Sequence, residues 1–342
     1  MRSSAASDVY KRQLHELYRL HEWRMKMKLR HLIGPQDITL EETNRILELA
    51  RRISANMDSY SEVAKRKKVA TLFYEPSTRT RLSFETAMLN LGGSVIGFPS
   101  ANVSSANKGE TVEDTIRVIS CYADIAVMRH PKEGAPLLAS LYSKIPVINA
   151  GDGGHNHPSQ TMIDLMTIKS RMGRLDHLKI GMCGDLKFGR TVHSLVQSLS
   201  RYEGNEFVFI SPEELRMPEY MLDELPIDSD AKWREERSLE KALPELDILY
   251  MTRVQQERFF NEEDYLRLRD SYILNAEKMQ LAKSNMAVLH PLPRINEISR
   301  DVDLDSRAAY FEQVQNGVYV RMALLMSFMG LEDPLTGECI LG

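Results

Sequence analysis

Cysteine is scarce in this sequence, long apolar runs are missing, and the net charge is close to zero. The three cysteines, Cys121, Cys183 and Cys339, form no Cys-x-x-Cys pair, so they indicate neither a disulfide framework nor a zinc ribbon. We therefore expect a reducing, cytoplasmic location. No apolar run approaches the roughly 18 residues that a membrane-spanning helix needs, which predicts no membrane partner. The net charge of -4 gives no electrostatic reason to expect nucleic acid.

What is present favours a globular protein with more than one core. The chain has 342 residues, of which 43% are hydrophobic, and this length suits two domains. Residues 1–30 differ from the rest because they carry eight Lys and Arg against three acidic residues. They lack the apolar segment of a secretory signal. We interpret them as a disordered extension or a leader added by cloning, with a transit peptide as the alternative.

Strand-like and helix-like patterns alternate from residue 33 onward. Apolar runs such as "VATLFY" (69–74) are followed by segments with helical spacing, and this order predicts parallel sheets covered by helices on both faces. We predict an α/β fold with a first domain over 31–160 and a second over 161–308. The last helix, about 309–330, has an apolar stripe that should pack back on the first domain: Phe311, Val314, Val318, Met322, Leu325 and Met329.

Open parallel sheets bind ligands beyond the carboxyl ends of their strands, so functional residues are expected in the turns that follow strands. The run Ser77-Thr78-Arg79-Thr80-Arg81 follows the strand at 69–74 and begins a helix. Backbone N–H groups at a helix N-terminus bind a phosphate or carboxylate, and the hydroxyls and an arginine would add donors. The alternative is a well-capped helix with exposed arginines. Two arginines two residues apart cannot face one ligand, so we expect one of them to brace the structure.

Two further turns of the first domain carry polar groups. Arg129 follows the strand "IAVM", and His155 and His157 lie in "GDGGHNHPSQT" (151–161). The H-x-H spacing suggests a metal, but no carboxylate or thiol cluster accompanies it. A neutral imidazole that polarises a carbonyl is the favoured interpretation of His157.

The second domain has three arginine-bearing turns. Arg190 follows "CGDLKFG", Arg253 and Gln255 lie in "YMTRVQQERF", and Arg294 ends "HPLPR" (290–294). Planar guanidinium groups in three turns would suit a small dicarboxylate. The loop "PSANVSSANKGET" (99–111) contains Lys108 and, taken alone, is typical of a solvent-exposed loop.

The four segments S-T-R-T-R, M-R-H-P, H-P-S-Q-T and H-P-L-P-R occur in this order between about residues 33 and 329. Together they resemble the aspartate carbamoyltransferase family. The resemblance implies transfer of a carbamoyl group from carbamoyl phosphate to the amino group of L-aspartate, the committed step of pyrimidine synthesis. It implies no metal and no organic cofactor.

The resemblance also implies roles for individual residues. The phosphate would be held by Ser77, Thr78, Arg79 and Thr80. The carbamoyl group would be held through its oxygen by Thr80, Arg129 and His157, through its nitrogen by Gln160, and by the backbone of Pro291 and Leu292. Of these residues, the expected catalytic ones are Arg79, Thr80, Arg129 and His157. Aspartate would be bound by Lys108, Arg190, Arg253, Gln255 and Leu292.

The resemblance further implies a homotrimer with shared active sites. Ser104 and Lys108 match a loop that enters the site of a neighbouring subunit. A separate regulatory chain is possible on the same grounds and stays open.

Three alternatives were weighed. An ornithine carbamoyltransferase shares the phosphate half but uses S-M-G and H-C-L-P segments where this chain has "TRVQQERF" and "HPLPR". A nicotinamide-dependent dehydrogenase needs a G-x-G-x-x-G fingerprint, which is absent. A non-catalytic relative is expected to lack Arg79, Arg129 or His157, and this chain has all three.

Overall fold

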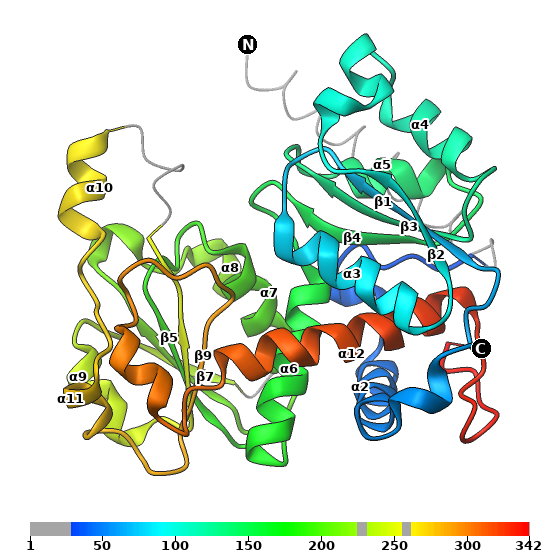
Figure 1. Ribbon diagram of the computed structural model, residues 1–342. Coiled ribbons are helices and arrows are strands. Elements are labelled where there is room, and N and C mark those ends of the chain that lie inside the picture. The colour runs from blue at the N-terminus through cyan, green and yellow to red at the C-terminus, as the bar shows by residue number, and fades with distance from the viewer. Residues whose placement is uncertain (1–28, 224–230, 255–260, 342) are drawn as a thin grey trace.

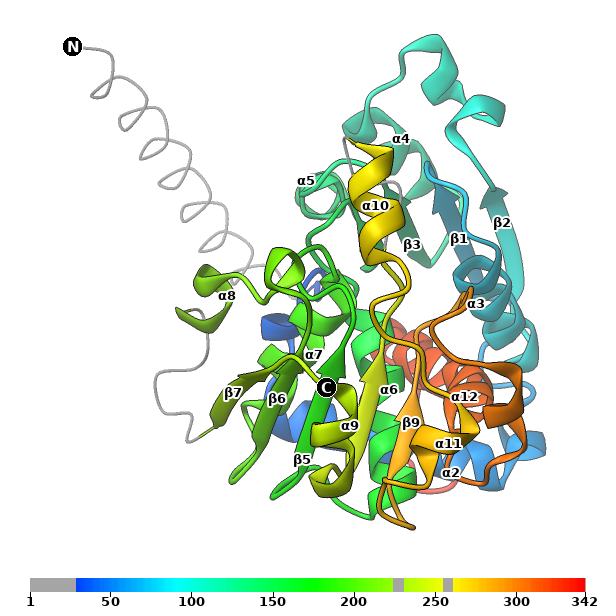
Figure 2. The ribbon, with the colours of Figure 1, turned by 90° about the vertical axis from the view of Figure 1, so that its left-hand side faces the viewer.

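The computed structural model describes residues 29–223, 231–254 and 261–341, and it contains two parallel β-sheets with helices packed on their faces (Figures 1 and 2). The basic extension predicted for residues 1–30 lies almost wholly outside these ranges. Within the ranges, no helix combines the length and the apolar character that crossing a bilayer requires.

The first sheet has four parallel strands in the order β2-β1-β3-β4. These are β1 (Lys68–Phe73), β2 (Ser94–Phe98), β3 (Ile125–His130) and β4 (Val147–Asp152). Apolar side chains of successive residues alternate between the faces and fill two separate clusters. One face is covered by α4 (Val112–Ile119) and α5 (Ala135–Tyr142), and the other by α2 (Leu40–Ala55) and α3 (Thr78–Asn90).

The second sheet has five parallel strands in the order β7-β6-β5-β8-β9. These are β5 (Lys179–Cys183), β6 (Glu206–Ile210), β7 (Lys232–Glu236), β8 (Ile248–Met251) and β9 (Ala287–Leu289). One face is covered by α7 (Arg190–Leu199), and the other by α9 (Leu239–Ala242) and α11 (Ala276–Met279). The short helices α8 (Glu219–Asp223) and α10 (Glu262–Leu268) follow β6 and β8 along the chain. The predicted α/β fold with two parallel sheets is confirmed.

Two long helices, α6 (Pro158–Met172) and α12 (Tyr310–Met329), cross between the sheets (Figure 1). Helix α12 packs against α2, α3 and α6, so it returns to the first domain as predicted. The apolar stripe predicted for it is buried at Met322 and Leu325. The prediction of a buried stripe is wrong at the first turns of the helix, because Phe311 is 55% and Val314 is 46% exposed. This end of the helix passes the mouth of a cleft, and Val314 lines that cleft.

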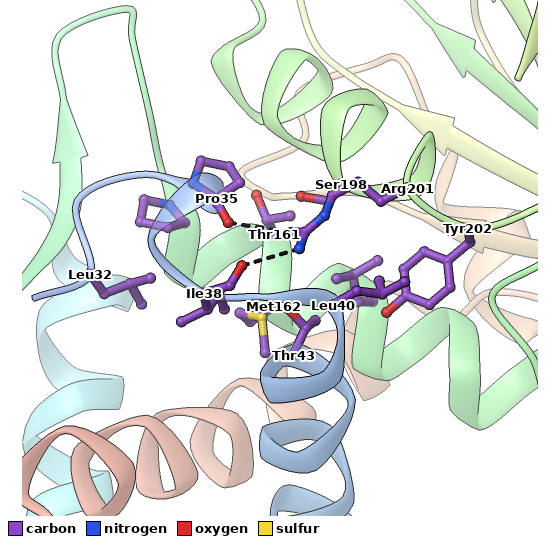
Figure 3. A pocket seen from close by; sticks show the side chains of 12 residues that line it. Leu32, Pro35, Ile38, Leu40, Thr43, Thr161, Met162, Ser198, Arg201 and Tyr202 are labelled. Carbon is purple, nitrogen blue, oxygen red and sulfur yellow. Dashed lines mark hydrogen bonds between the residues drawn. The ribbon is translucent and has the colours of Figure 1, made fainter. Parts of the chain in front are cut away.

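A second contact joins the domains beside α6 (Figure 3). Arg201, just after α7, donates to the backbone carbonyls of Pro35 at 3.4 Å and Ile38 at 3.1 Å. The hydroxyl of Tyr202 donates to Asn44 at 3.1 Å. The hollow between these groups has a free volume of about 10 Å³, which is no more than one water molecule needs. It is therefore a structural joint between the domains and holds no substrate.

Candidate active site

The order of the strands explains where a cleft opens. In the first sheet β1 lies between β2 and β3, so the chain runs to one side after β1 and to the other side after β3. In the second sheet β5 lies between β6 and β8, and the chain likewise runs to opposite sides after β5 and after β8. Crevices form at such switch points, beyond the carboxyl ends of the strands. A cleft of about 570 Å³ lies there, and it is lined by eleven of the predicted site residues: Ser77, Thr78, Arg79, Thr80, Arg129, His157, Gln160, Arg190, Arg253, Pro291 and Leu292.

The N-terminus of α3 points into this cleft. Ser77 is the N-cap of the helix, yet its side chain makes no capping hydrogen bond, so the first backbone N–H groups have no side-chain partner from it. The interpretation of S-T-R-T-R as a conventionally capped helix start is therefore not supported. Arg81 does not line the cleft and pairs with Glu85 at 2.8 Å. Arg79 lines the cleft and is solvent-exposed, and partial desolvation together with the charges of Arg129 and Arg253 lowers its pKa.

Arg129, the penultimate residue of β3, carries its guanidinium into the cleft. Its Nη2 lies 3.0 Å from Oε2 of Glu75. Burial lowers the pKa of Arg129, and the Glu75 carboxylate opposes this shift. Gly151, with φ of +117°, allows a second arginine to approach: a Cβ there would lie 3.1 Å from Nη1 of Arg129 and 3.3 Å from Nη2 of Arg190. A glycine at this position is thus required by both its backbone angle and its surroundings.

His157 is the N-cap residue of α6, and it is buried. Burial and the positive charges of Arg190, Arg129 and Arg321 hold its pKa well below the ordinary value. The imidazole is therefore neutral near pH 7, as the sequence interpretation expected, and can donate one N–H to an oxygen in the cleft. His155 is exposed and lies 3.4 Å from Asp152 instead, so the two histidines do not act together.

The second domain contributes Arg190 and Arg253. Arg190 is the first residue of α7, and its Nη1 donates to the backbone carbonyl of Gly153 across the domain boundary. Arg253 follows β8 and lines the cleft. Gln255, the third predicted aspartate contact, lies outside the described residues.

The turn after β9 forms the remaining wall. Pro291 and Leu292 line the cleft, and His290 holds the turn from behind. The Nδ1 atom of His290 accepts from the backbone N–H of Leu292 at 2.8 Å, and its Nε2 lies 2.7 Å from the buried carboxylate of Glu297. The turn is therefore fixed by a buried pair of side chains as well as by its prolines.

Two predicted residues are not brought into the cleft of their own chain. Ser104 lies between two short 3₁₀ segments that connect β2 to α4, and Lys108 ends the second of them; neither residue lines the cleft. This loop projects from the first domain at the edge formed by β2 (Figures 1 and 2).

The sequence interpretation missed several polar groups of the cleft. Arg321 of α12 is 4% exposed, donates to Ser83 at 2.6 Å and lies over the ring of Phe84. Burial lowers its pKa to about 9. A single arginine inside an apolar helix was the available signal, because a charge at such a position needs a partner.

In the part of the chain that the structure describes, no three His, Cys, Asp or Glu side chains are close enough to hold a metal ion.

Two parallel-sheet domains that direct arginines, hydroxyls and a neutral imidazole into one cleft define an α/β enzyme for small anionic substrates. Residues 30–170 match the model of the aspartate/ornithine carbamoyltransferase carbamoyl-P binding domain, and residues 176–328 match that of the Asp/Orn binding domain. The chain therefore belongs to the aspartate/ornithine carbamoyltransferase family.

Several similar proteins are aspartate carbamoyltransferases. The aspartate carbamoyltransferase catalytic subunit of Lachnoclostridium phytofermentans is 64% identical over 89% of this chain and 99% of its own length. That of Clostridium acetobutylicum is 61% identical over 89% and 99%. The catalytic subunit of M. jannaschii aspartate transcarbamoylase has a TM-score of 0.81 at 48% identity, covering 88% and 98%. The Trypanosoma cruzi enzyme in complex with carbamoyl phosphate and aspartate has a TM-score of 0.82 at 36% identity, covering 88% and 97%.

Proposed function

We propose that this chain is an aspartate carbamoyltransferase, which converts carbamoyl phosphate and L-aspartate to N-carbamoyl-L-aspartate and phosphate. The observation that carries the proposal is the opposition of two cationic groups across one cleft. Arg79 and Arg129 come from the first domain, and Arg190 and Arg253 come from the second. The first pair suits a phosphate, and the second suits the two carboxylates of aspartate. The product is the precursor of pyrimidines, and we keep the predicted cytoplasmic location with this proposal.

The reaction requires no covalent intermediate. The neutral amino group of aspartate attacks the carbamoyl carbon, and the carbonyl oxygen acquires negative charge in the tetrahedral intermediate. Thr80, Arg129 and His157 supply three donors of different chemistry for this oxygen, and donors fixed in advance stabilise it most. The C–O bond to phosphate then breaks, and the departing phosphate accepts the proton that the amine loses.

The charge of the donors matters for this step. A protonated His157 would add a fourth positive charge beside Arg129, Arg190 and Arg321, which the low pKa of its imidazole avoids. A neutral N–H donor polarises the carbonyl oxygen without attracting the phosphate away from Arg79. The two substrates are brought together from opposite walls of the cleft, and this proximity lowers the barrier by several kcal/mol.

The substrate specificity is tested by phosphate release from carbamoyl phosphate in the presence of either aspartate or ornithine. We expect turnover with aspartate and none above background with ornithine, because a cationic side chain would face Arg190 and Arg253. Turnover with ornithine alone would contradict the proposal.

The assembly belongs to the same proposal. We infer a homotrimer in which Lys108 completes the site of a neighbouring subunit, since this residue is remote from the cleft of its own chain. Inactive Lys108→Ala and Arg79→Ala trimers should recover part of the activity when their subunits exchange, because one mixed site then has both residues. No recovery after verified exchange would argue against shared sites. Binding of a separate regulatory chain stays an open question.

A further inference from the structure

A buried carboxylate lies behind the cleft and contacts three elements at once. Asp164 of α6 is fully buried. Its Oδ1 accepts from Nε2 of Gln160 at 2.8 Å and from Nε2 of Gln313 at 2.6 Å, and its Oδ2 accepts from the hydroxyl of Tyr250 at 2.9 Å. Gln160 lies in the first turn of α6, Gln313 belongs to α12, and Tyr250 belongs to β8 of the second sheet. One side chain thus joins both domains directly behind the site.

These contacts determine how Gln160 presents its amide. A carboxylate accepts hydrogen bonds, so the NH₂ group of Gln160 must face Asp164. The carbonyl oxygen of the same amide is then available to the cleft that Gln160 lines. An acceptor at that position matches an NH₂ group on the ligand and mismatches a methyl group.

The second contact reaches the wall formed by Pro291 and Leu292. Because the NH₂ group of Gln313 faces Asp164, its carbonyl oxygen accepts from the backbone N–H of His290 at 3.0 Å. His290 in turn holds the backbone N–H of Leu292. The Pro291–Leu292 turn is therefore linked to the same carboxylate as Gln160, through Gln313 and then His290.

We propose that Asp164 is a positioning residue that makes the cleft selective for the carbamoyl nitrogen, by directing the Gln160 carbonyl at it and holding the Pro291–Leu292 turn. The inference rests on the proposed function, which places Gln160, Pro291 and Leu292 around this nitrogen. Burial raises the pKa of Asp164 to about 7, while the hydrogen bonds from Gln160, Tyr250 and Gln313 oppose the shift. Burial thus makes ionisation of Asp164 costly, and the three hydrogen bonds favour the ionised form.

The test compares two ligands that differ only at the group in question. Acetyl phosphate has a methyl group where carbamoyl phosphate has NH₂, so the ratio of their dissociation constants reports selectivity for the nitrogen. In the full-length protein we expect carbamoyl phosphate to bind more tightly. Asp164→Leu, which cannot accept a hydrogen bond, should weaken carbamoyl phosphate about tenfold or more and acetyl phosphate less than threefold. Asp164→Asn keeps an acceptor and should retain most of the ratio.

Thr167→Val provides a matched control. Thr167 is one turn further along α6, and its hydroxyl accepts a hydrogen bond from the side chain of Asn316 of α12 at 3.1 Å. The variant therefore loses a buried contact between the same two helices, while the cleft is unchanged. We expect this variant to leave the ratio unchanged. Equal weakening of both ligands by Asp164→Leu, or none, would overturn the inference.

A double-mutant cycle decides the matter if Asp164→Leu does not fold. Gln160→Glu places a second carboxylate against Asp164 and should weaken carbamoyl phosphate strongly, and adding Asp164→Asn should recover at least tenfold of that loss. Additive effects would overturn the inference. Equal affinity of the unmodified protein for the two phosphates would also overturn the inference, whereas failure to carbamoylate aspartate would contradict the proposed function.

Discussion

The two walls of the cleft are built differently. The wall from the first domain uses the N-terminus of α3, the end of β3 and the N-cap of α6, so its groups are part of regular elements. The second domain supplies Arg190 at the start of α7 and Arg253 just after β8. Its remaining contribution, Pro291 and Leu292, belongs to a turn held from behind by His290.

This difference suggests how one fold serves two second substrates. Backbone N–H groups at a helix N-terminus can bind a phosphate, and residues 30–170 match a carbamoyl-P binding domain described for both aspartate and ornithine carbamoyltransferases. The second substrate is recognised by side chains in and after turns, which change without altering the sheet. In the proposed function, the cationic second wall of this chain accounts for the choice of aspartate over ornithine.

The largest effect is expected from the first wall. Arg129→Ala should lower kcat by about 10²–10³, because it removes a donor to the developing oxyanion and leaves Glu75 without its partner. Steady-state rates with both substrates saturating measure this. Arg117→Ala is the control, since Arg117 lies over Tyr142 on the surface and should keep kcat within twofold. Equal kcat values for the two variants would show that Arg129 does not take part in the reaction.

A substitution in the second wall should change KM and not kcat. Arg253→Ala is expected to raise the KM for aspartate about 100-fold, since a charge-assisted contact to a carboxylate is lost, while the KM for carbamoyl phosphate changes little. Arg237→Ala, which removes a second-domain arginine paired with Glu235 at 3.0 Å, should alter neither value. If Arg253→Ala weakened both substrates alike, the two walls would not be separate in function.

A substitution between the walls should affect both. Gly151→Ala places a Cβ against Arg129 and Arg190 at a φ of +117°, so we expect about a tenfold loss in kcat/KM for each substrate. Gly173→Ala is the matched control, because its φ is +74° but nothing lies within 4 Å of an added Cβ. A similar loss in both variants would indicate backbone strain alone.

The smallest effect concerns pH. The pKa of His157 in the folded protein lies well below the ordinary value of about 6.5, so the imidazole stays neutral as pH falls from 8 to 6. An NMR titration of the His157 ring should show no protonation in this range. In the unfolded chain the residue takes up its proton near pH 6.5, so it reduces stability only as pH falls below that value. A midpoint near 6.5 in the folded protein would contradict a neutral donor.

Sequence reasoning succeeded where the signal was local. The turn at 77–81 combined a preceding apolar strand with hydroxyls at a helix start, and the structure places it at the carboxyl end of β1. It missed β7, because Lys232–Glu236 is a charged, largely exposed strand without an apolar alternation. It also misjudged the first turns of α12, where Phe311 and Val314 are exposed and Val314 lines the cleft.

The polar groups behind the cleft could not be predicted, because their partners are far apart in sequence. Tyr250 and Asp164 are 86 residues apart, and Arg321 and Ser83 are 238 apart. Whether a buried charge is satisfied depends on such pairs, and a single sequence does not reveal them. The strand-end turns indicated where substrates bind, whereas only the three-dimensional structure showed what holds those turns in place.

The two-wall arrangement is tested most directly with N-(phosphonacetyl)-L-aspartate, the compound bound in a Trypanosoma cruzi aspartate transcarbamoylase structure. Its affinity and that of inorganic phosphate are measured by calorimetry for the unmodified protein, Arg79→Ala and Arg253→Ala. We expect the compound to bind about 100-fold more weakly to each variant, while phosphate is weakened by Arg79→Ala and changes less than threefold in Arg253→Ala. Loss of phosphate binding in Arg253→Ala equal to that in Arg79→Ala, or unchanged binding of the compound in either variant, would contradict it.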